Sequence, residues 1–178
     1  TMTWKLVKQI VHDDALRKSF IDLAIKTFDL SFKEWYRKGY WTDAYIPYAL
    51  VSNNKVIANA SANIIDLIWQ GEPRRYIQIG TVMTDIDHRN RGLAGQLVNE
   101  ILADWQDKAD AFFLFANPTT VDFYPKFGFE RTDEHQYIMP VVPAAGDFRK
   151  LDMDRPEDVA LLQRYYQKSN PFSQLRVQ

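Results

Sequence analysis

The feature that most constrains the fold is residues 76–105, where a strand-like run passes through a small-residue loop directly into an amphipathic helix. The first part is rich in β-branched and aromatic side chains, which favour a strand: Tyr76, Ile77, Ile79, Val82 and Met83. Apolar residues then recur with helical spacing on one face: Ala94, Leu97, Val98, Ile101, Leu102 and Trp105. The stretch therefore predicts a strand, a loop and a helix in direct succession.

The loop between them has the composition of an anion site. A helix start carries unpaired backbone N–H groups and the positive end of the helix dipole. Gly92, Ala94 and Gly95 allow a ligand to approach the backbone closely, while Arg89 and Arg91 add positive charge. The loop therefore predicts a site for a diphosphate, with an ordinary strand–loop–helix connection as the alternative.

Two other phosphate-binding loops do not fit this segment. A Walker loop needs Gly-Lys-Ser/Thr after its glycines, whereas Gly95 is followed by Gln96. A dinucleotide fingerprint needs three glycines in the pattern G-x-G-x-x-G, and here only Gly92 and Gly95 are present. The sequence therefore disfavours both a nucleoside triphosphatase loop and a dinucleotide-binding loop.

Two ordered motifs resemble those of a known family. One is Arg89-Asn90-Arg91-Gly92-Leu93-Ala94, which resembles the R/Q-x-x-G-x-G/A signature of the GNAT superfamily of N-acetyltransferases. The other is residues 114–130, where the family has a strand ending near a polar residue, then a short helix with a tyrosine, then an aromatic-Gly-aromatic turn. The matching residues are Asn117, Tyr124, Phe127, Gly128 and Phe129. The resemblance spans about residues 3–140.

The resemblance implies a role for each matched residue. In the family the loop holds the pyrophosphate of acetyl-coenzyme A (acetyl-CoA), and the strand before it bonds the pantetheine arm. The implied coenzyme-binding residues are Val82, Met83, Thr84, Arg89, Asn90, Arg91, Gly92, Leu93, Ala94, Gly95 and Asn117. Tyr124 is implied as the catalytic residue that protonates the departing thiolate, and a backbone N–H near Met83 would face the thioester carbonyl. Many members carry proline where this chain has Ile86, a difference that should alter only the turn.

The order of expected elements predicts an α+β fold of three layers, with a mixed, mostly antiparallel sheet and helices on both faces. This is also the acyl-CoA N-acyltransferase order that the resemblance implies. The expected strands are residues 3–11, 46–51, 55–69, a run ending at 83, 111–116 and a closing region at 130–139. The expected helices are residues 13–28, 32–38, 94–105 and 120–126. A capping box of Ser31 and Glu34 is expected to start the second helix.

Composition narrows the function classes. The chain has 22 Lys plus Arg against 23 Asp plus Glu, so it lacks the basic excess that a nucleic-acid partner would need. The absence of cysteine excludes a thiol nucleophile and thiolate metal ligands. The three histidines, His12, His88 and His135, are scattered, so no metal is expected. The longest apolar run, residues 111–116, is too short to span a membrane. We therefore expect a cytoplasmic enzyme with no membrane partner.

The acceptor site is less defined. Aromatic residues are dense between Phe28 and Tyr48, a segment that helps to form the acceptor pocket in the family. These rings line a substrate pocket or, as the preferred interpretation for any single ring, fill the core. Glu34, Asp66 and Asp85 are candidates to accept the amine proton, although surface or capping roles are favoured for each.

The chain divides near residue 140. Residues 1–140 are expected to form the acetyltransferase domain, and residues 141–178 a linker and a C-terminal helical extension. A helix is predicted from about Pro156 to near Asn170-Pro171, with an apolar face at Val159, Leu162 and Tyr166. This extension is the start of a truncated second unit, or it packs on the first domain or on a second copy of the chain as a homodimer.

These features predict an enzyme that transfers an acetyl group from acetyl-CoA to a primary amine of a small molecule by direct attack. A peptide or protein N-acetyltransferase and a non-catalytic acyl-CoA-binding module are the alternatives. An intact Arg89–Gly95 loop together with Tyr124 favours a catalyst, because a pure binder would not need the tyrosine hydroxyl. The acceptor amine stays open.

Overall fold

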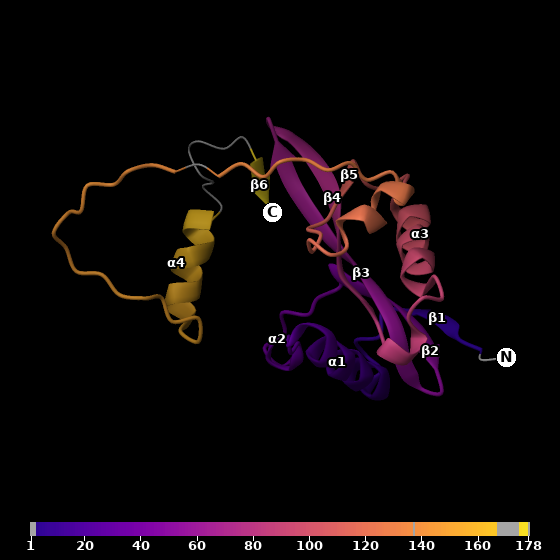
Figure 1. Ribbon diagram of the computed structural model, residues 1–178. Helices are drawn as coiled ribbons and strands as arrows, with labels where there is room; N and C mark the ends of the chain where they lie inside the picture. Colours follow the sequence, from indigo (N-terminus) through magenta and orange to yellow (C-terminus); the bar gives the residue numbers. More distant parts are fainter. Residues whose placement is uncertain (1–2, 137, 167–174, 178) are drawn as a thin grey trace.

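The computed structural model describes residues 3–136 and 138–166, together with the backbone of 175–177 (Figure 1). The strands are β1 (Lys5–Lys8), β2 (Tyr45–Ser52), β3 (Lys55–Trp69), β4 (Glu72–Thr84), β5 (Ala111–Phe113) and β6 (Leu175–Val177). The α-helices are α1 (Asp14–Phe28), α2 (Lys33–Arg37), α3 (Leu93–Trp105) and α4 (Pro156–Tyr166). Three single turns of 3-10 helix are η1 (Ile86–His88), η2 (Val121–Phe123) and η3 (Pro125–Phe127).

One sheet organises these elements. Its strand order is β1-β2-β3-β4-β5, and β6 pairs with the far end of β3. Only the β4–β5 pair is parallel among the described strand pairs, because α3 connects these two strands as a crossover. Helices α1 and α2 lie on one face of the sheet, and α3 lies on the other (Figure 1). The predicted α+β fold, with a mixed, mostly antiparallel sheet between helices, is confirmed.

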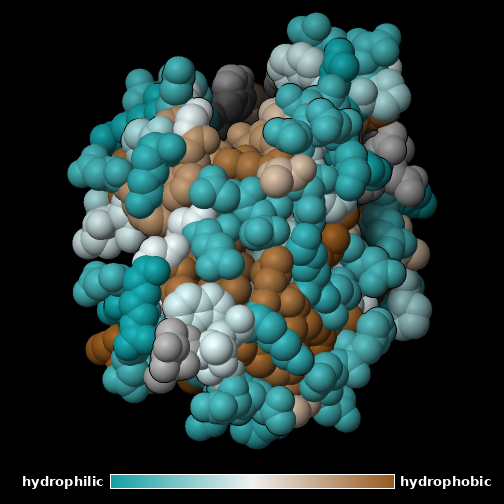
Figure 2. Space-filling view, turned by 90° about the vertical axis from the view of Figure 1, so that its right-hand side faces the viewer, coloured by the Kyte–Doolittle hydropathy of each residue, from teal (hydrophilic) through white to brown (hydrophobic). Residues whose placement is uncertain are grey.

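Each face of the sheet has its own core. On one face, the side chains of Phe20 and Leu23 of α1 pack on Tyr45 and Ala49 of β2. On the α3 face, Leu97, Val98 and Ile101 of the predicted apolar stripe are almost completely buried against β2, β3 and β4, as is Leu93, which precedes the stripe. Figure 2 shows the side of the molecule to the right in Figure 1, where apolar surface lies among hydrophilic side chains.

Several local predictions agree with the structure. The Asn53-Asn54 turn joins β2 and β3 as predicted, and both residues have positive φ, which asparagine tolerates better than most residues. Asp13 caps α1 by accepting a hydrogen bond from the N–H of Leu16 at 2.9 Å.

Four local predictions are wrong. No capping box forms at α2, because Phe32 is the N-cap and Glu34 bonds Arg37 instead. The helix expected at 120–126 is two successive 3-10 turns, with Pro125 beginning the second. Strand β5 ends at Phe113 rather than at residue 116, and the described residues of 130–139 form no strand. A strand requires a backbone partner. Residues 114–116 have none because β4 pairs with β5 only at Tyr76–Gln78, and in the described residues no strand lies along the outer edge of β5 to pair with 130–139.

The C-terminal extension contains the predicted helix, which begins at Pro156 as α4. The predicted helix end near Asn170-Pro171 lies outside the described residues. In the first turn of α4, Asp158 is buried and its carboxylate binds the Arg149 guanidinium at 2.5 and 2.6 Å. None of the described helices combines the length and the apolar composition needed to cross a membrane.

Candidate functional site

Strand β4 contains a bulge just before the predicted pantetheine-binding residues. Asn59 of β3 pairs with Met83, but Ser61 pairs with Gly80, so β4 has one residue more than β3 across this interval. Thr81 has a φ of 49°, a left-handed conformation that is rare for a β-branched residue. A bulge bends its strand and increases the local twist. The last residues of β4 therefore turn away from the line of the rest of the strand.

Beyond the bulge, β4 and β5 separate. The two strands pair only where Tyr76–Gln78 faces Ala111–Phe113. In the described structure no backbone hydrogen bond joins residues 79–84 to residues 114–117. The result is a wedge in the sheet, in which backbone groups of β4 are available to an extended, amide-containing ligand. The predicted residues Val82 and Thr84 are half-buried at this wedge, whereas the side chain of Met83 is buried in the core under α1.

The Arg89–Gly95 loop follows the wedge directly. Both Asn90 (φ 61°) and Gly92 (φ 74°) are left-handed, which turns the chain sharply into α3. Gly92 is the N-cap, no side chain caps the helix, and the first intrahelical bond runs from the Gln96 N–H to the Gly92 carbonyl at 3.0 Å. The N–H groups of the first turn, including those of Leu93 and Ala94, are thus available to a ligand.

The two arginines of this loop are exposed. The Arg89 Nε donates to the Thr84 carbonyl at 3.3 Å, and an Arg91 guanidinium nitrogen donates to the Asp87 carbonyl at 3.3 Å. Both side chains therefore bond carbonyl groups of the segment that leads into α3. Their charge and the helix dipole act in the same sense and attract an anion to this point.

Gly95 has a packing role in addition to its place in the loop. A Cβ atom built on Gly95 would lie 3.3 Å from the Cζ of Phe127. The missing side chain therefore makes room for the Phe127 ring, and it brings η3 against the start of α3. The two sequence motifs, far apart in the chain, are in contact here.

Tyr124 lies between η2 and η3 and is 9% exposed. Its ring packs against Phe123 at 5.0 Å and Phe129 at 6.1 Å between centroids. Its hydroxyl has no hydrogen-bond partner in the part of the chain that the structure describes. Burial raises the pKa of the phenol, so the hydroxyl keeps its proton at neutral pH.

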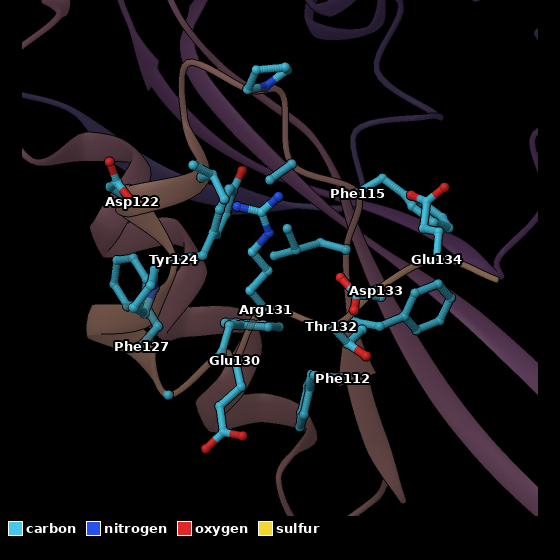
Figure 3. Close-up of a pocket in the computed structure, with 18 of the residues that line it drawn as sticks. Phe112, Phe115, Asp122, Tyr124, Phe127, Glu130, Arg131, Thr132, Asp133 and Glu134 are labelled. Carbon is cyan, nitrogen blue, oxygen red and sulfur yellow. The ribbon is translucent and has the colours of Figure 1, made fainter.

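Tyr124 also lines a cavity of about 1050 Å³ that runs along β5. Figure 3 shows Tyr124 on one side of this cavity and Phe115 on the other, with Arg131 extending between them. The cavity is lined by no residue of 82–84 or 89–95. The residues of the wedge and of the coenzyme loop therefore lie outside the lining of this cavity. Arg131 belongs to neither of the two sequence motifs, so no pattern in the sequence marks it as a cavity residue.

Asn117 is exposed, four residues beyond the end of β5. Its carbonyl accepts hydrogen bonds from the N–H of Thr120 at 2.8 Å and from the Thr120 hydroxyl at 3.1 Å. In the structure, its backbone stabilises the turn into η2.

Each candidate carboxylate forms an ion pair. Glu34 binds Arg37, Asp66 binds Arg75, and Asp85 binds Lys26. In each case the hydrogen bond to that cation is the main cause that lowers the carboxyl pKa. A carboxylate with a lowered pKa is a weaker base. The geometry therefore disfavours all three as the group that accepts the amine proton.

Most of the aromatic segment belongs to the core. Trp41 and Tyr45 are buried, and Phe32, Trp35, Trp41 and Tyr45 form ring contacts with one another at 5.2–5.9 Å. Phe28, Tyr36 and Tyr40 are at least one-third exposed. The exposed rings are the ones that remain available to an acceptor. Among the described residues, no cluster of three or more His, Asp or Glu side chains is arranged to hold a metal.

Comparison with known proteins agrees with this geometry. The profile of the acetyltransferase (GNAT) domain family matches residues 14–132. No curated protein matches the chain significantly.

Solved structures share the fold at low sequence identity. A predicted acetyltransferase with acetyl-CoA from Clostridium acetobutylicum has a TM-score of 0.61 and 20% identity over 77% of this chain and 96% of its own. Glucosamine-6-phosphate N-acetyltransferase from Arabidopsis thaliana has a TM-score of 0.60 and 19% identity over 77% and 98%. An aminoglycoside acetyltransferase from an uncultured soil metagenomic sample has a TM-score of 0.57 and 19% identity over 79% and 100%.

Proposed function

Because the chain belongs to the acetyltransferase (GNAT) domain family, we propose that it transfers the acetyl group of acetyl-CoA to a primary amine of a small molecule. The observation that carries this proposal is the continuity of the wedge with the Arg89–Gly95 loop. An extended pantetheine arm fits beside Val82–Thr84, and the pyrophosphate fits the uncapped start of α3. We include Asn117 in the proposed coenzyme site only because it matches a residue of the second sequence motif.

The proposed reaction is a direct transfer. The amine nitrogen attacks the thioester carbonyl carbon, the C–S bond breaks, and the thiolate takes the proton of the Tyr124 hydroxyl, which water then replaces. The backbone N–H of Val82 stabilises the negative charge that develops on the carbonyl oxygen, since the neighbouring Met83 N–H faces Asn59 of β3. Water accepts the amine proton, since the three candidate carboxylates all bind cations.

A small amine is favoured as the acceptor for two reasons. Two of the similar structures are named as acetyltransferases of an aminoglycoside and of glucosamine-6-phosphate, which are small amines. In this chain the aromatic segment packs over the α1 face of the sheet, which limits the space there. A peptide acceptor and a non-catalytic acyl-CoA binder are the alternatives.

The proposal extends to the arrangement of the chain. We assign catalysis to residues 1–140 and treat residues 141–178 as a linker and helical extension. We place the enzyme in the cytoplasm, which the absence of cysteine supports weakly. A metal and a nucleic-acid partner are not part of the proposed reaction.

Calorimetry with acetyl-CoA tests the site, using Gly92→Glu as the disruptive variant. Glutamate adds bulk and negative charge where amides must face an anion, so affinity should fall by at least about 100-fold, or 2.7 kcal/mol. Gly71→Glu is a matched control, since Gly71 has a φ of +88° and open space like Gly92 but lies in the β3–β4 turn. Equal affinity in both variants would refute the loop assignment.

A turnover screen tests the reaction itself. The acceptors are diamines, aminoglycosides, amino acids and peptides with free N-termini, and the signal is the release of free thiol. We expect a small amine to stimulate release. A preference for peptides would favour the first alternative, and tight acetyl-CoA binding without stimulation by any amine would favour the non-catalytic binder.

A further inference from the structure

The strained residue Thr81 is held by two side chains from neighbouring strands. The Tyr45 hydroxyl and the Thr81 hydroxyl are 2.7 Å apart, and the Asn59 side-chain amide donates to the Thr81 carbonyl at 3.0 Å. The same amide also donates to the Ser61 hydroxyl at 2.9 Å. Thr81 is therefore fixed at its side chain from β2 and at its backbone from β3.

Both of these side chains are buried. Tyr45 is 8% exposed and Asn59 is fully buried, on the face of the sheet that packs against α1. Burying polar groups costs free energy unless they are hydrogen-bonded. Strained backbone conformations persist where the surroundings hold them, and they cluster at functional sites. These contacts therefore stabilise a left-handed conformation that a threonine in an isolated strand would not adopt.

We propose that Tyr45 and Asn59 are positioning residues that hold the β4 bulge at Thr81 and so orient the N–H group of Val82 at the wedge. The inference rests on the proposed function, because that N–H group is the one assigned to the thioester carbonyl. Donors fixed in advance stabilise a developing oxyanion best, and a displacement of about 1 Å costs on the order of 100-fold in rate.

Tyr45→Phe is the sharpest variant, since it removes one oxygen and keeps the ring in the aromatic core. Tyr48→Phe is a matched control: Tyr48 lies on the same strand and is buried, but its hydroxyl donates to Asp104 on the α3 face. Amide hydrogen exchange in the free protein measures the bulge directly. We expect the Met83 amide, which faces Asn59 in the ladder with β3, to exchange about 10-fold faster in Tyr45→Phe, with the Ile77 amide unchanged, and no such change in Tyr48→Phe.

Kinetics then connect the bulge with the reaction. We expect Tyr45→Phe to lower kcat by about 10-fold or more while the KM for acetyl-CoA changes by less than about twofold, as for loss of an interaction made only in the transition state. In Thr81→Gly, which relieves the positive φ and lacks the hydroxyl, the further change Tyr45→Phe should add little. Asn59→Asp, which cannot donate to the Thr81 carbonyl when ionised, should reproduce the faster exchange.

The outcomes separate this inference from the proposed function. Equal exchange at Met83 in Tyr45→Phe and Tyr48→Phe would overturn the inference, as would faster exchange with an unchanged kcat. If the native protein bound no acetyl-CoA, the proposed function would fail, while the exchange experiment would still show whether the two side chains hold the bulge.

Discussion

Tyr124 combines a buried ring with a hydroxyl that has no protein partner in the described structure. A ring that served only for packing would not need the oxygen. We expect Tyr124→Phe to bind acetyl-CoA normally and to turn over about 10²- to 10⁴-fold more slowly, as is typical when a general acid is removed. Stopped-flow acetyl transfer together with calorimetry measures both quantities.

The matched control for this variant is Tyr76→Phe. Tyr76 is half-buried on β4, and its ring contacts Phe113 at 6.4 Å, but it lines neither the wedge nor the cavity. Its variant should keep native turnover. If Tyr124→Phe also kept native turnover under conditions in which product release is fast, Tyr124 would be a packing residue and water would protonate the thiolate.

Tyr45 gives a prediction about pH and stability. Burial is the main cause that raises the pKa of its phenol to about 12. Between pH 10 and 12 the unfolded chain loses this proton while the folded chain keeps it, so the free energy of unfolding falls as the pH rises through this window. The loss is on the order of 2–3 kcal/mol. Urea unfolding at pH 9 and pH 12 should show a smaller loss in Tyr45→Phe than in the native protein, and equal losses would argue against a buried neutral phenol.

At the scale of single elements, Gly95 of α3 is in contact with the Phe127 ring of η3. Alanine favours a helix over glycine by about 1 kcal/mol, but at position 95 its Cβ would meet the Phe127 ring at 3.3 Å. We therefore expect Gly95→Ala to stabilise the protein in a Phe127→Leu background and to gain less, or to destabilise, in the native background.

Urea unfolding of the four proteins in this cycle gives the coupling free energy between positions 95 and 127. We expect a magnitude of at least about 0.5 kcal/mol, because residues in contact are not additive. Additive effects would mean that η3 does not pack on α3 and that the two sequence motifs are not joined at this contact.

The elements also show what a sequence can predict here. β2, β3, α1 and α3 have strong periodicity and local turn or cap signals, and their predicted ends agree with the structure to within two residues. The bulge at Thr81 had no signal, because threonine is not a residue that marks a positive φ, and its partners Tyr45 and Asn59 lie 36 and 22 residues away. The strand expected at 130–139 failed because strand formation depends on a distant partner rather than on local composition.

At the scale of the whole molecule, the same limit applies to the coenzyme loop and the second motif. Their composition predicted their chemistry, but not that Phe127 would join them or that Gly95 would serve packing. The surface or capping roles favoured for Glu34, Asp66 and Asp85 agree with the structure, but their partners were not predictable. Arg37, Arg75 and Lys26 pair with them, and a pairing across up to 59 residues is not visible in a motif.

The last prediction concerns the C-terminal extension. Leu162 and Tyr166 of α4 are 46% and 59% exposed, although their spacing predicts an apolar face. The ion pair of Lys38 with Asp154, at 2.7 Å, connects the segment before α4 with the segment after α2, and it contributes little to stability because both groups are exposed to solvent.

We therefore expect the double variant Leu162→Ser/Tyr166→Ser to lower the free energy of unfolding by less than about 1 kcal/mol, as surface substitutions do. Leu97→Ala, in the buried stripe of α3, should lower it by about 2–5 kcal/mol. Urea unfolding at several protein concentrations measures both. A loss in the double variant that approaches the Leu97→Ala value would show that α4 packs on the first domain, and a loss that appears only at high concentration would show that it packs on a second copy of the chain.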